Sequence, residues 1–237
     1  MRHDGRRADE LRPVSLERGF SKYAEGSCLI KIGNTHMHVT ATVDEQVPRF
    51  RKGSGEGWIT AEYAMLPRSG RERNQRDNMK CNGRSLEIQR LIGRAMRSIV
   101  NLGAMGERQI TLDCDAILAD GGTRCAAITA SYVALYDAFL WMREKKMLKT
   151  NPLKEPVAAI SVGVFRNQEI LDLDYLEDSN AETDMNVVMT SASQFVEIQG
   201  TAESEPFSAE TLGRMLALAR KGCLELIAAQ KRVLDIE

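Results

Sequence analysis

Apolar residues alternate with more polar ones in several short stretches of the first half of the chain, with the period of a half-buried strand. Within residues 26 to 44, the alternating apolar positions are occupied by Met37, Val39, Ala41 and Val43. A Gly-Asn pair at positions 33 and 34 interrupts this stretch and predicts a hairpin with its turn there. The same alternation predicts strands over residues 58 to 66 and 108 to 118.

Between those two strands the spacing of apolar residues changes to three and four, which predicts a helix over residues 85 to 102. We expect Ser85 to cap the start of this helix. Its polar face carries Arg90, Arg94 and Arg97. A second helix is predicted from 123 to 146, and it ends before Pro152 because a proline ring and its missing amide stop helical continuation.

The second half of the chain continues with strands and ends in a long amphipathic helix. We expect strands at 157 to 165, 169 to 174, 186 to 190 and 194 to 199, and a helix at 208 to 233. This order of elements indicates a mixed α and β chain of the α+β class. Since no segment has the composition of a linker, residues 1 to 237 are expected to form a single domain.

The composition is that of a folded globular chain, with 43% hydrophobic and 27% charged residues among 237. The longest strongly apolar stretch, residues 157 to 165, is about half of the roughly 20 residues that a membrane span needs. Acidic residues stand where a signal peptide would have its apolar core. We therefore expect a soluble cytoplasmic protein with no membrane partner, and we expect its five cysteines to be reduced because they include no CxxC pair.

Charge is segregated along the chain, although the net charge is only −1. Residues 66 to 97 contain nine basic and three acidic residues, whereas residues 167 to 213 contain eleven acidic residues and no Lys or Arg. This distribution indicates an anion-binding surface beside a carboxylate cluster that can hold a hard divalent cation. Two solvated faces of opposite charge would give the same pattern.

The junction after the strand at 108 to 118 is a candidate phosphate site. Gly121 and Gly122 lead directly into a helix, whose first amides lack intrahelical partners and whose dipole favours anions. Thr123 adds a hydroxyl, Arg124 adds a fork of donors that suits phosphate oxygens, and Arg84 also lies near the start of a helix. The alternative is an ordinary turn followed by a surface arginine.

The acidic segment offers a candidate metal site. Asp178 and Asp184 are six residues apart in a polar connection between strands. Paired carboxylates of this kind can bind magnesium together with substrate phosphates. A solvated acidic loop is the alternative, and the lack of nearby Lys or Arg in the sequence predicts carboxylates without local partners.

Histidine chemistry is not expected at either candidate site. His3, His36 and His38 all lie in the first 38 residues, and we expect them to be structural or surface groups. A Ser-His-Asp or Cys-His hydrolase is therefore disfavoured, and the sequence contains no GxSxG motif.

A basic segment without an apolar period precedes Arg84 and contains Arg68, Arg73 and Arg76. It has no aromatic residue on which a base could stack, so we expect it to hold RNA through the phosphate backbone rather than by sequence. A solvated loop or a subunit contact would account for it equally well.

Seven segments, in order along nearly the whole chain, resemble those of the ribonuclease PH family: MRHDGRRADELRPV, KYAEGS, GWITAEYAMLPR, LEIQRLIGRAMR, ITLDCDAILADGGTR, EDSNAETDMNVVMT and EIQGTAESEPFS. By this resemblance, the residues matching the family's phosphate-binding positions are Arg84, Gly122, Thr123 and Arg124. Asp178 and Asp184 match the acidic pair associated with magnesium and catalysis. The chain departs from the family pattern at Asn82, Ser85 and Cys125.

The resemblance implies a phosphorolytic 3′-to-5′ exoribonuclease that trims the 3′ ends of precursor transfer RNA. It implies inorganic phosphate as co-substrate, release of nucleoside diphosphates, reversible nucleotidyl transfer and ribosomal RNA as a further substrate. It also implies a fold related to the second domain of ribosomal protein S5 and a homohexamer built as a trimer of dimers. Arg68, Arg73 and Arg76 would then lie near subunit contacts and the RNA path.

Two other functions fit parts of the same pattern. A metal-dependent hydrolytic nuclease would use the acidic and basic segments equally well, and phosphate dependence distinguishes it from a phosphorolytic enzyme. A non-catalytic ring subunit that only binds RNA would also need the basic segment. Such subunits tend to lose the catalytic carboxylates or phosphate arginines, which this chain retains.

Overall fold

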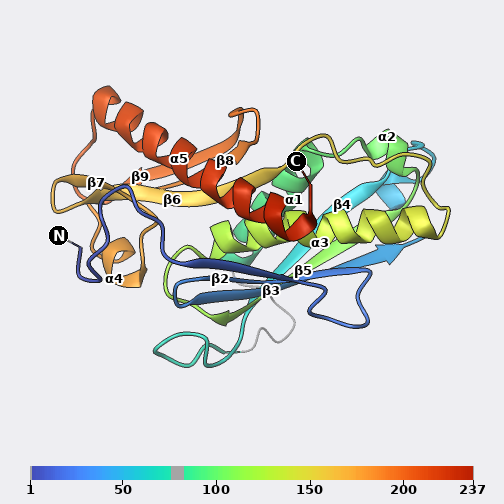
Figure 1. Cartoon of the computed structure of the whole chain (residues 1–237), viewed down its shortest axis with the longest axis horizontal. Helices are drawn as coiled ribbons and strands as arrows, with labels where there is room; N and C mark the ends of the chain where they lie inside the picture. Colours follow the sequence, from blue (N-terminus) through green and yellow to red (C-terminus); the bar gives the residue numbers. More distant parts are fainter. Residues whose placement is uncertain (1, 76–82, 237) are drawn as a thin grey trace.

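The computed structural model describes residues 2–75 and 83–236 (Figure 1). Three residues discussed above lie outside these ranges. They are Arg76, which was predicted to contact RNA or another subunit, Asn82, which departs from the family pattern, and Cys81. The other four cysteines are free and buried, which confirms the prediction of reduced thiols for them: Cys28, Cys114, Cys125 and Cys223.

The first sheet is formed by strands from the first half of the chain. It contains β1 (Val14–Arg18), β2 (Gly26–Ile32), β3 (Thr35–Asp44), β4 (Trp58–Met65) and β5 (Gln109–Leu118). Their order is β1-β2-β3-β5-β4, and β4 pairs with β5 in parallel while the other neighbours are antiparallel. The predicted hairpin is confirmed, since β2 and β3 pair on either side of Gly33 and Asn34.

The second sheet is antiparallel throughout and has the order β7-β6-β8-β9. Its strands are β6 (Val157–Phe165), β7 (Gln168–Leu171), β8 (Thr183–Thr190) and β9 (Phe195–Ala202). The predicted hairpin of β6 and β7 is confirmed. β8 begins three residues earlier than predicted, because Asp184 was assigned to the polar connection before the strand.

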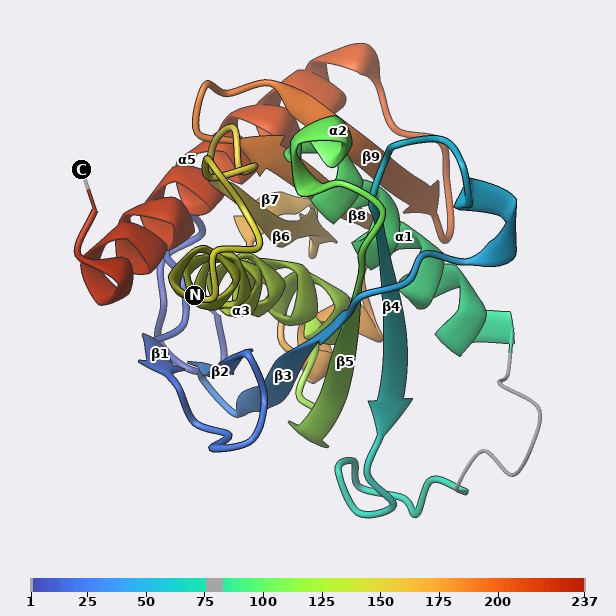
Figure 2. The same ribbon diagram turned by 90° about the vertical axis from the view of Figure 1, so that its right-hand side faces the viewer.

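The helices lie between and outside the two sheets. They are α1 (Gly83–Ser98), α2 (Leu102–Met105), α3 (Thr123–Glu144), α4 (Tyr175–Asp178) and α5 (Ala209–Leu234), with a short 3-10 turn at Arg49–Arg51. Figure 2 shows α3 nearly end-on, with β2 and β3 on one side and β6 on the other. α5 covers the outer face of the second sheet (Figure 1).

Because both sheets pack on α3, this helix is buried around most of its circumference, and small residues such as alanine and serine predominate in its first half. Among the described helices it alone has the length and composition to cross a membrane, yet it is mostly buried inside the protein. One large hydrophobic core runs through both sheets, α1, α3 and α5, and Ile170, Leu173 and Ala181 form a small second cluster.

The predicted bounds of α1 were wrong, and β1 was not predicted. α1 starts at Gly83, so Ser85 lies inside its first turn rather than capping it, and the helix ends at Ser98, four residues before the predicted end. β1 was missed because it has only five residues, and the alternation of Val14 and Leu16 with polar residues is too short to stand out.

Candidate active site

The loop between β5 and α3 has the geometry of an anion site. Gly121 and Gly122 have φ angles of 79° and 70°, in the left-handed region that favours glycine. Gly122 is the N-cap of α3, and its carbonyl accepts the first helical hydrogen bond, from Ala126 at 3.0 Å. The amides of the first turn therefore lack intrahelical acceptors and stand at the positive end of the helix dipole.

The two side chains that follow these glycines are held by residues from other elements. The Thr123 hydroxyl lies 2.8 Å from the phenol oxygen of Tyr63 on β4. Arg124 Nη1 lies 3.3 Å from a carboxylate oxygen of Glu87 on α1 and donates at 3.3 Å to the side-chain oxygen of Gln199 on β9. Arg124 is thus oriented between α1 and the edge of the second sheet.

Arg84 projects from the first turn of α1 and is exposed. Burial raises the pKa of the Tyr63 phenol, and the charges of Arg84 and Arg124 counteract that rise. Both arginines are therefore close enough to act electrostatically on the same side chain. The structure brings together two cations that are 40 residues apart in sequence, at the N-terminal ends of two helices.

The two predicted carboxylates come from different elements rather than from one polar loop, which corrects the sequence-based description. Asp178 is the last residue of α4, and Asp184 is the second residue of β8. Although Asp178 is exposed as a residue, burial of its carboxyl raises its pKa, and the nearby Asp184 carboxylate raises it further. Arg84 and Arg124 act in the opposite direction. The charges of Asp184, Arg84 and Arg124 therefore all act on the Asp178 carboxyl.

The register of the second sheet explains why Asp184 faces this site. Side chains alternate along a strand, so Asp184 and Asn186 share one face of β8, while Met185 points to the opposite face and is buried. Asn186 accepts a hydrogen bond at 3.2 Å from Cys125, in the first turn of α3. Opposite Asp184 on β6 is Gly163, which has no side chain to cover the carboxylate.

Three acidic residues near the pair are buried and have partners that are distant in sequence. Their partners come from the N-terminal segment, which passes beside α4 (Figure 1). The ion pairs join Arg2 to Glu177, Arg6 to Asp172, Asp174 and Glu177, and Arg12 to Asp172. The signal in the sequence was the high density of arginine in the first twelve residues, but nothing local indicated where those arginines bind.

His3 also lies at this end of the molecule. Its Nε2 atom is 2.5 Å from a carboxylate oxygen of Asp174, the residue that caps α4. His3, Asp174 and Glu177 could in principle surround a cation, since their ligand atoms lie within 4.8 Å of one another. Arg2 and Arg6 already pair with these carboxylates, so a divalent cation would be repelled there.

The basic segment reaches the site from the end of β4. The Ser69 carbonyl accepts a hydrogen bond of 2.9 Å from the amide of Ala119, just before the glycine pair. Arg68 and Arg73 are exposed, and the guanidinium of Arg71 lies 5.7 Å from the ring centre of Tyr175 on α4. The described part of this segment therefore borders both the candidate phosphate loop and the acidic helix.

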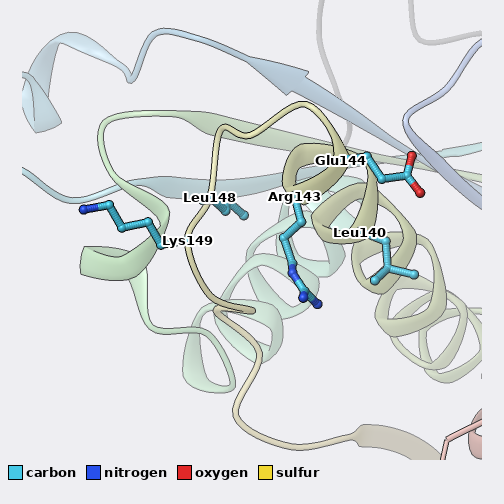
Figure 3. A pocket seen from close by; sticks show the side chains of 5 residues that line it. All are labelled: Leu140, Arg143, Glu144, Leu148 and Lys149. Carbon is cyan, nitrogen blue, oxygen red and sulfur yellow. The ribbon is translucent and has the colours of Figure 1, made fainter.

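A hollow at the opposite end of α3 is not part of this arrangement (Figure 3). It has a volume of about 430 Å³ and is lined by Leu140, Arg143, Glu144, Leu148 and Lys149. A helix of 22 residues is about 33 Å long, so this hollow is remote from Thr123 and Arg124.

Two family models and a curated relative match this chain. The model of the 3′ exoribonuclease family, domain 1, matches residues 10–140, and that of domain 2 matches residues 155–222. A curated Ribonuclease PH from Methylobacterium radiotolerans is 56% identical over 236 residues, which cover 99% of this chain and 100% of that protein.

Solved structures share the fold. The Archaeoglobus fulgidus exosome with RNA bound to the active site gives a TM-score of 0.81 at 20% identity, covering 95% of this chain and 91% of that chain. Rrp46 from rice (Oryza sativa) gives a TM-score of 0.76 at 20% identity, covering 99% of this chain and 96% of that chain. An archaeal exosome core gives a TM-score of 0.79 at 20% identity, covering 97% of this chain and 91% of that chain.

Proposed function

The chain belongs to the ribonuclease PH family of phosphate-dependent 3′ exoribonucleases, and from that premise we propose that phosphorolysis takes place between the N-terminus of α3 and the Asp178–Asp184 pair. The predicted enzyme class, a nucleotidyltransferase that processes the 3′ ends of transfer RNA, is confirmed at the level of the family. Within the proposed site, the arginines bind phosphate and the aspartates bind metal.

The main obstacle in this reaction is electrostatic, since inorganic phosphate attacks a phosphodiester that is also an anion. Two unit charges of like sign repel by about 4 kcal/mol at about 4 Å and an effective dielectric of about 20. Arg84, Arg124 and the free amides after Gly122 offset this repulsion by binding the attacking phosphate. The Thr123 hydroxyl supplies a further hydrogen bond.

The Asp178–Asp184 pair is suited to magnesium. Its donors are carboxylate oxygens. The pKa of Asp178 is raised by burial and then by the Asp184 carboxylate, and a bound divalent cation would relieve that repulsion. Magnesium would be held by Asp178 and Asp184 and would stabilise negative charge on the scissile or leaving phosphate.

The bond changes follow from this placement. An oxygen of inorganic phosphate forms a bond to the phosphorus of the last phosphodiester, and the bond from that phosphorus to the 3′ oxygen of the preceding nucleotide breaks. The 3′ oxygen takes up a proton, and a nucleoside diphosphate leaves. Because phosphate is ionised before it binds, the step requires no strong general base, which fits a site built from arginines and aspartates. The reverse reaction adds a nucleotide to an RNA 3′ end.

The observation that carries this proposal is the shared electrostatic environment of Asp178, Asp184, Arg84 and Arg124. The test is to incubate the purified protein with magnesium and a 3′-extended transfer RNA, with and without inorganic phosphate. Nucleoside diphosphates released only with phosphate support the proposal. Monophosphates released without phosphate would indicate a hydrolytic nuclease, and no release would indicate an RNA-binding subunit without activity.

We further propose that Arg68, Arg73 and Arg76 guide RNA toward this site, and that the chain works in the cytoplasm as a homohexamer, with ribosomal RNA as an additional substrate. Exposed apolar residues beside the basic segment, Leu66, Ile117 and Leu118, support a subunit contact in this region. The continuous core supports our proposal that the chain forms one domain. Light scattering after size exclusion would give six times the 26.4 kDa chain mass for a hexamer.

A further inference from the structure

Arg12 connects the loop before α3 to the acidic segment that leads into α4. Its side chain is only 6% exposed and lies in the segment before β1. Toward the loop, Nη1 donates to the Asp120 carbonyl at 2.6 Å, and Nη2 donates to the Gly121 carbonyl at 3.4 Å. Toward the acidic segment, Nε and Nη2 donate to the two carboxylate oxygens of Asp172 at 2.9 and 2.7 Å.

The Asp172 end of this connection is rigid. The Asp172 carboxylate also accepts a hydrogen bond of 2.8 Å from the Arg12 amide, and its own amide donates to the Ser161 carbonyl at 2.8 Å. Asp172 has a φ of 56°, which a non-glycine residue adopts only when its surroundings hold it there. Two residues later, Asp174 caps α4 by accepting bonds from the amides of Leu176 and Glu177.

We propose that Arg12 is a positioning residue that fixes the phosphate-binding loop at a set distance from the Asp178–Asp184 pair. This inference rests on the proposed function of that site. The guanidinium binds the carbonyls of Asp120 and Gly121, so it orients the peptide units that lead to the phosphate-binding amides. It is not a catalytic residue, because Nε, Nη1 and Nη2 are all bonded to protein acceptors and the side chain is buried.

The planar guanidinium of Arg12 binds three groups at once: the Asp172 carboxylate and the carbonyls of Asp120 and Gly121. A lysine at position 12 would keep the charge that balances Asp172 but could not bind a carboxylate in bidentate fashion and two carbonyls as well. Thr35 also holds this loop, since its hydroxyl donates to the Gly121 carbonyl at 2.6 Å and accepts from the Asp120 amide at 3.0 Å. Without the Arg12 contacts the loop would be held less firmly, and a misplacement of about 1 Å can reduce a rate by roughly a hundredfold. The substitution should weaken phosphate binding rather than RNA binding, because the carbonyls that Arg12 binds lie in the proposed phosphate loop.

The test compares Arg12→Lys with Gln230→Leu in the full-length protein. Gln230 is a suitable control because it is also buried and donates to two main-chain carbonyls, of Thr129 and Val157, that lie outside the phosphate loop and the acidic segment. Melting temperature, the KM for phosphate, the KM for RNA and kcat are measured for both variants. Binding of inorganic phosphate alone is measured by calorimetric titration.

Arg12→Lys is expected to raise the KM and the dissociation constant for phosphate about tenfold and to leave the KM for RNA within twofold of its original value. Gln230→Leu is expected to lower the melting temperature without changing phosphate binding. Equal phosphate binding by wild type and Arg12→Lys would overturn the positioning role. If the wild-type protein bound no phosphate, the proposed function itself would fail, and the two failures are therefore distinguishable.

Discussion

The backbone of Gly121 lies directly against that of Tyr175, the first residue of α4. A Cβ atom at Gly121 would be 2.8 Å from the Tyr175 nitrogen and 2.7 Å from the Leu173 carbonyl oxygen. The phosphate-binding loop and the helix that ends in Asp178 can therefore approach each other only because position 121 has no side chain. This close approach sets the spacing of the two halves of the proposed site.

Gly121→Ala is expected to abolish phosphorolysis and to lower the melting temperature clearly. The added methyl group would meet main-chain atoms that cannot move aside, and a left-handed φ at a non-glycine residue costs about 1 kcal/mol or more in addition. Gly53→Ala is the matched control, since Gly53 has a φ of 84° but nothing within 4 Å of its virtual Cβ. Equal loss of stability in both variants would show that the contact with Tyr175 is unimportant.

Arg124→Ala is expected to raise the concentration of phosphate required and to reduce turnover by roughly tenfold to a thousandfold, as the loss of one transition-state donor does. Steady-state kinetics at varied phosphate concentration would measure both effects. Arg143→Ala, an exposed position near the opposite end of the same helix, should leave the kinetics unchanged. Unaltered phosphate dependence in Arg124→Ala would remove Arg124 from the phosphate site.

Asp184→Asn is expected to abolish turnover while RNA binding stays largely intact, because the change removes a metal-binding charge but adds no bulk. Turnover and RNA binding by fluorescence anisotropy would be compared in the same preparation. Glu182→Gln removes a charge two residues away, where the carboxylate accepts a hydrogen bond from the Asn167 amide, and it should retain activity. Full activity of Asp184→Asn would exclude the carboxylate pair from the mechanism.

Asp178→Asn is expected to raise the melting temperature at pH 7 in the absence of metal. The pKa of Asp178 is raised in the folded protein, by burial and then by Asp184, so its ionised form costs stability above that pKa. The cost disappears as pH falls through the raised pKa and below the ordinary value of 3.8. The gain in melting temperature should therefore shrink toward acid pH.

Calorimetry from neutral to acid pH would measure this dependence, and added magnesium should stabilise the wild-type protein more than Asp178→Asn. A variant that melts below the wild type at pH 7 without metal would contradict the assigned repulsion. Equal stabilisation of both proteins by magnesium would place the cation elsewhere.

Local patterns in the sequence predicted most of the secondary structure and suggested the residues of the proposed site. The period of two located β3 and β5, and the spacing of three and four located most of α1, because such patterns reflect burial of one face. The glycine pair before Thr123 indicated a phosphate loop, since its conformation and the free helix amides are local properties. Asp178 and Asp184 were identified as a pair, although their placement on α4 and β8 was not.

Only the tertiary structure determined which of these elements and side chains are in contact. Arg2, Arg6 and Arg12 contact Asp172 and Glu177 across 160 or more residues, and no local period encodes a contact over that separation. The direction of Asp184 depends on strand register against β6, and the contact of Gly121 with Tyr175 depends on the packing of both sheets around α3. The sequence by itself determined which groups could do the chemistry, because their types and immediate neighbours are local. Their distances were determined by long-range pairing and packing, which depend on the whole fold.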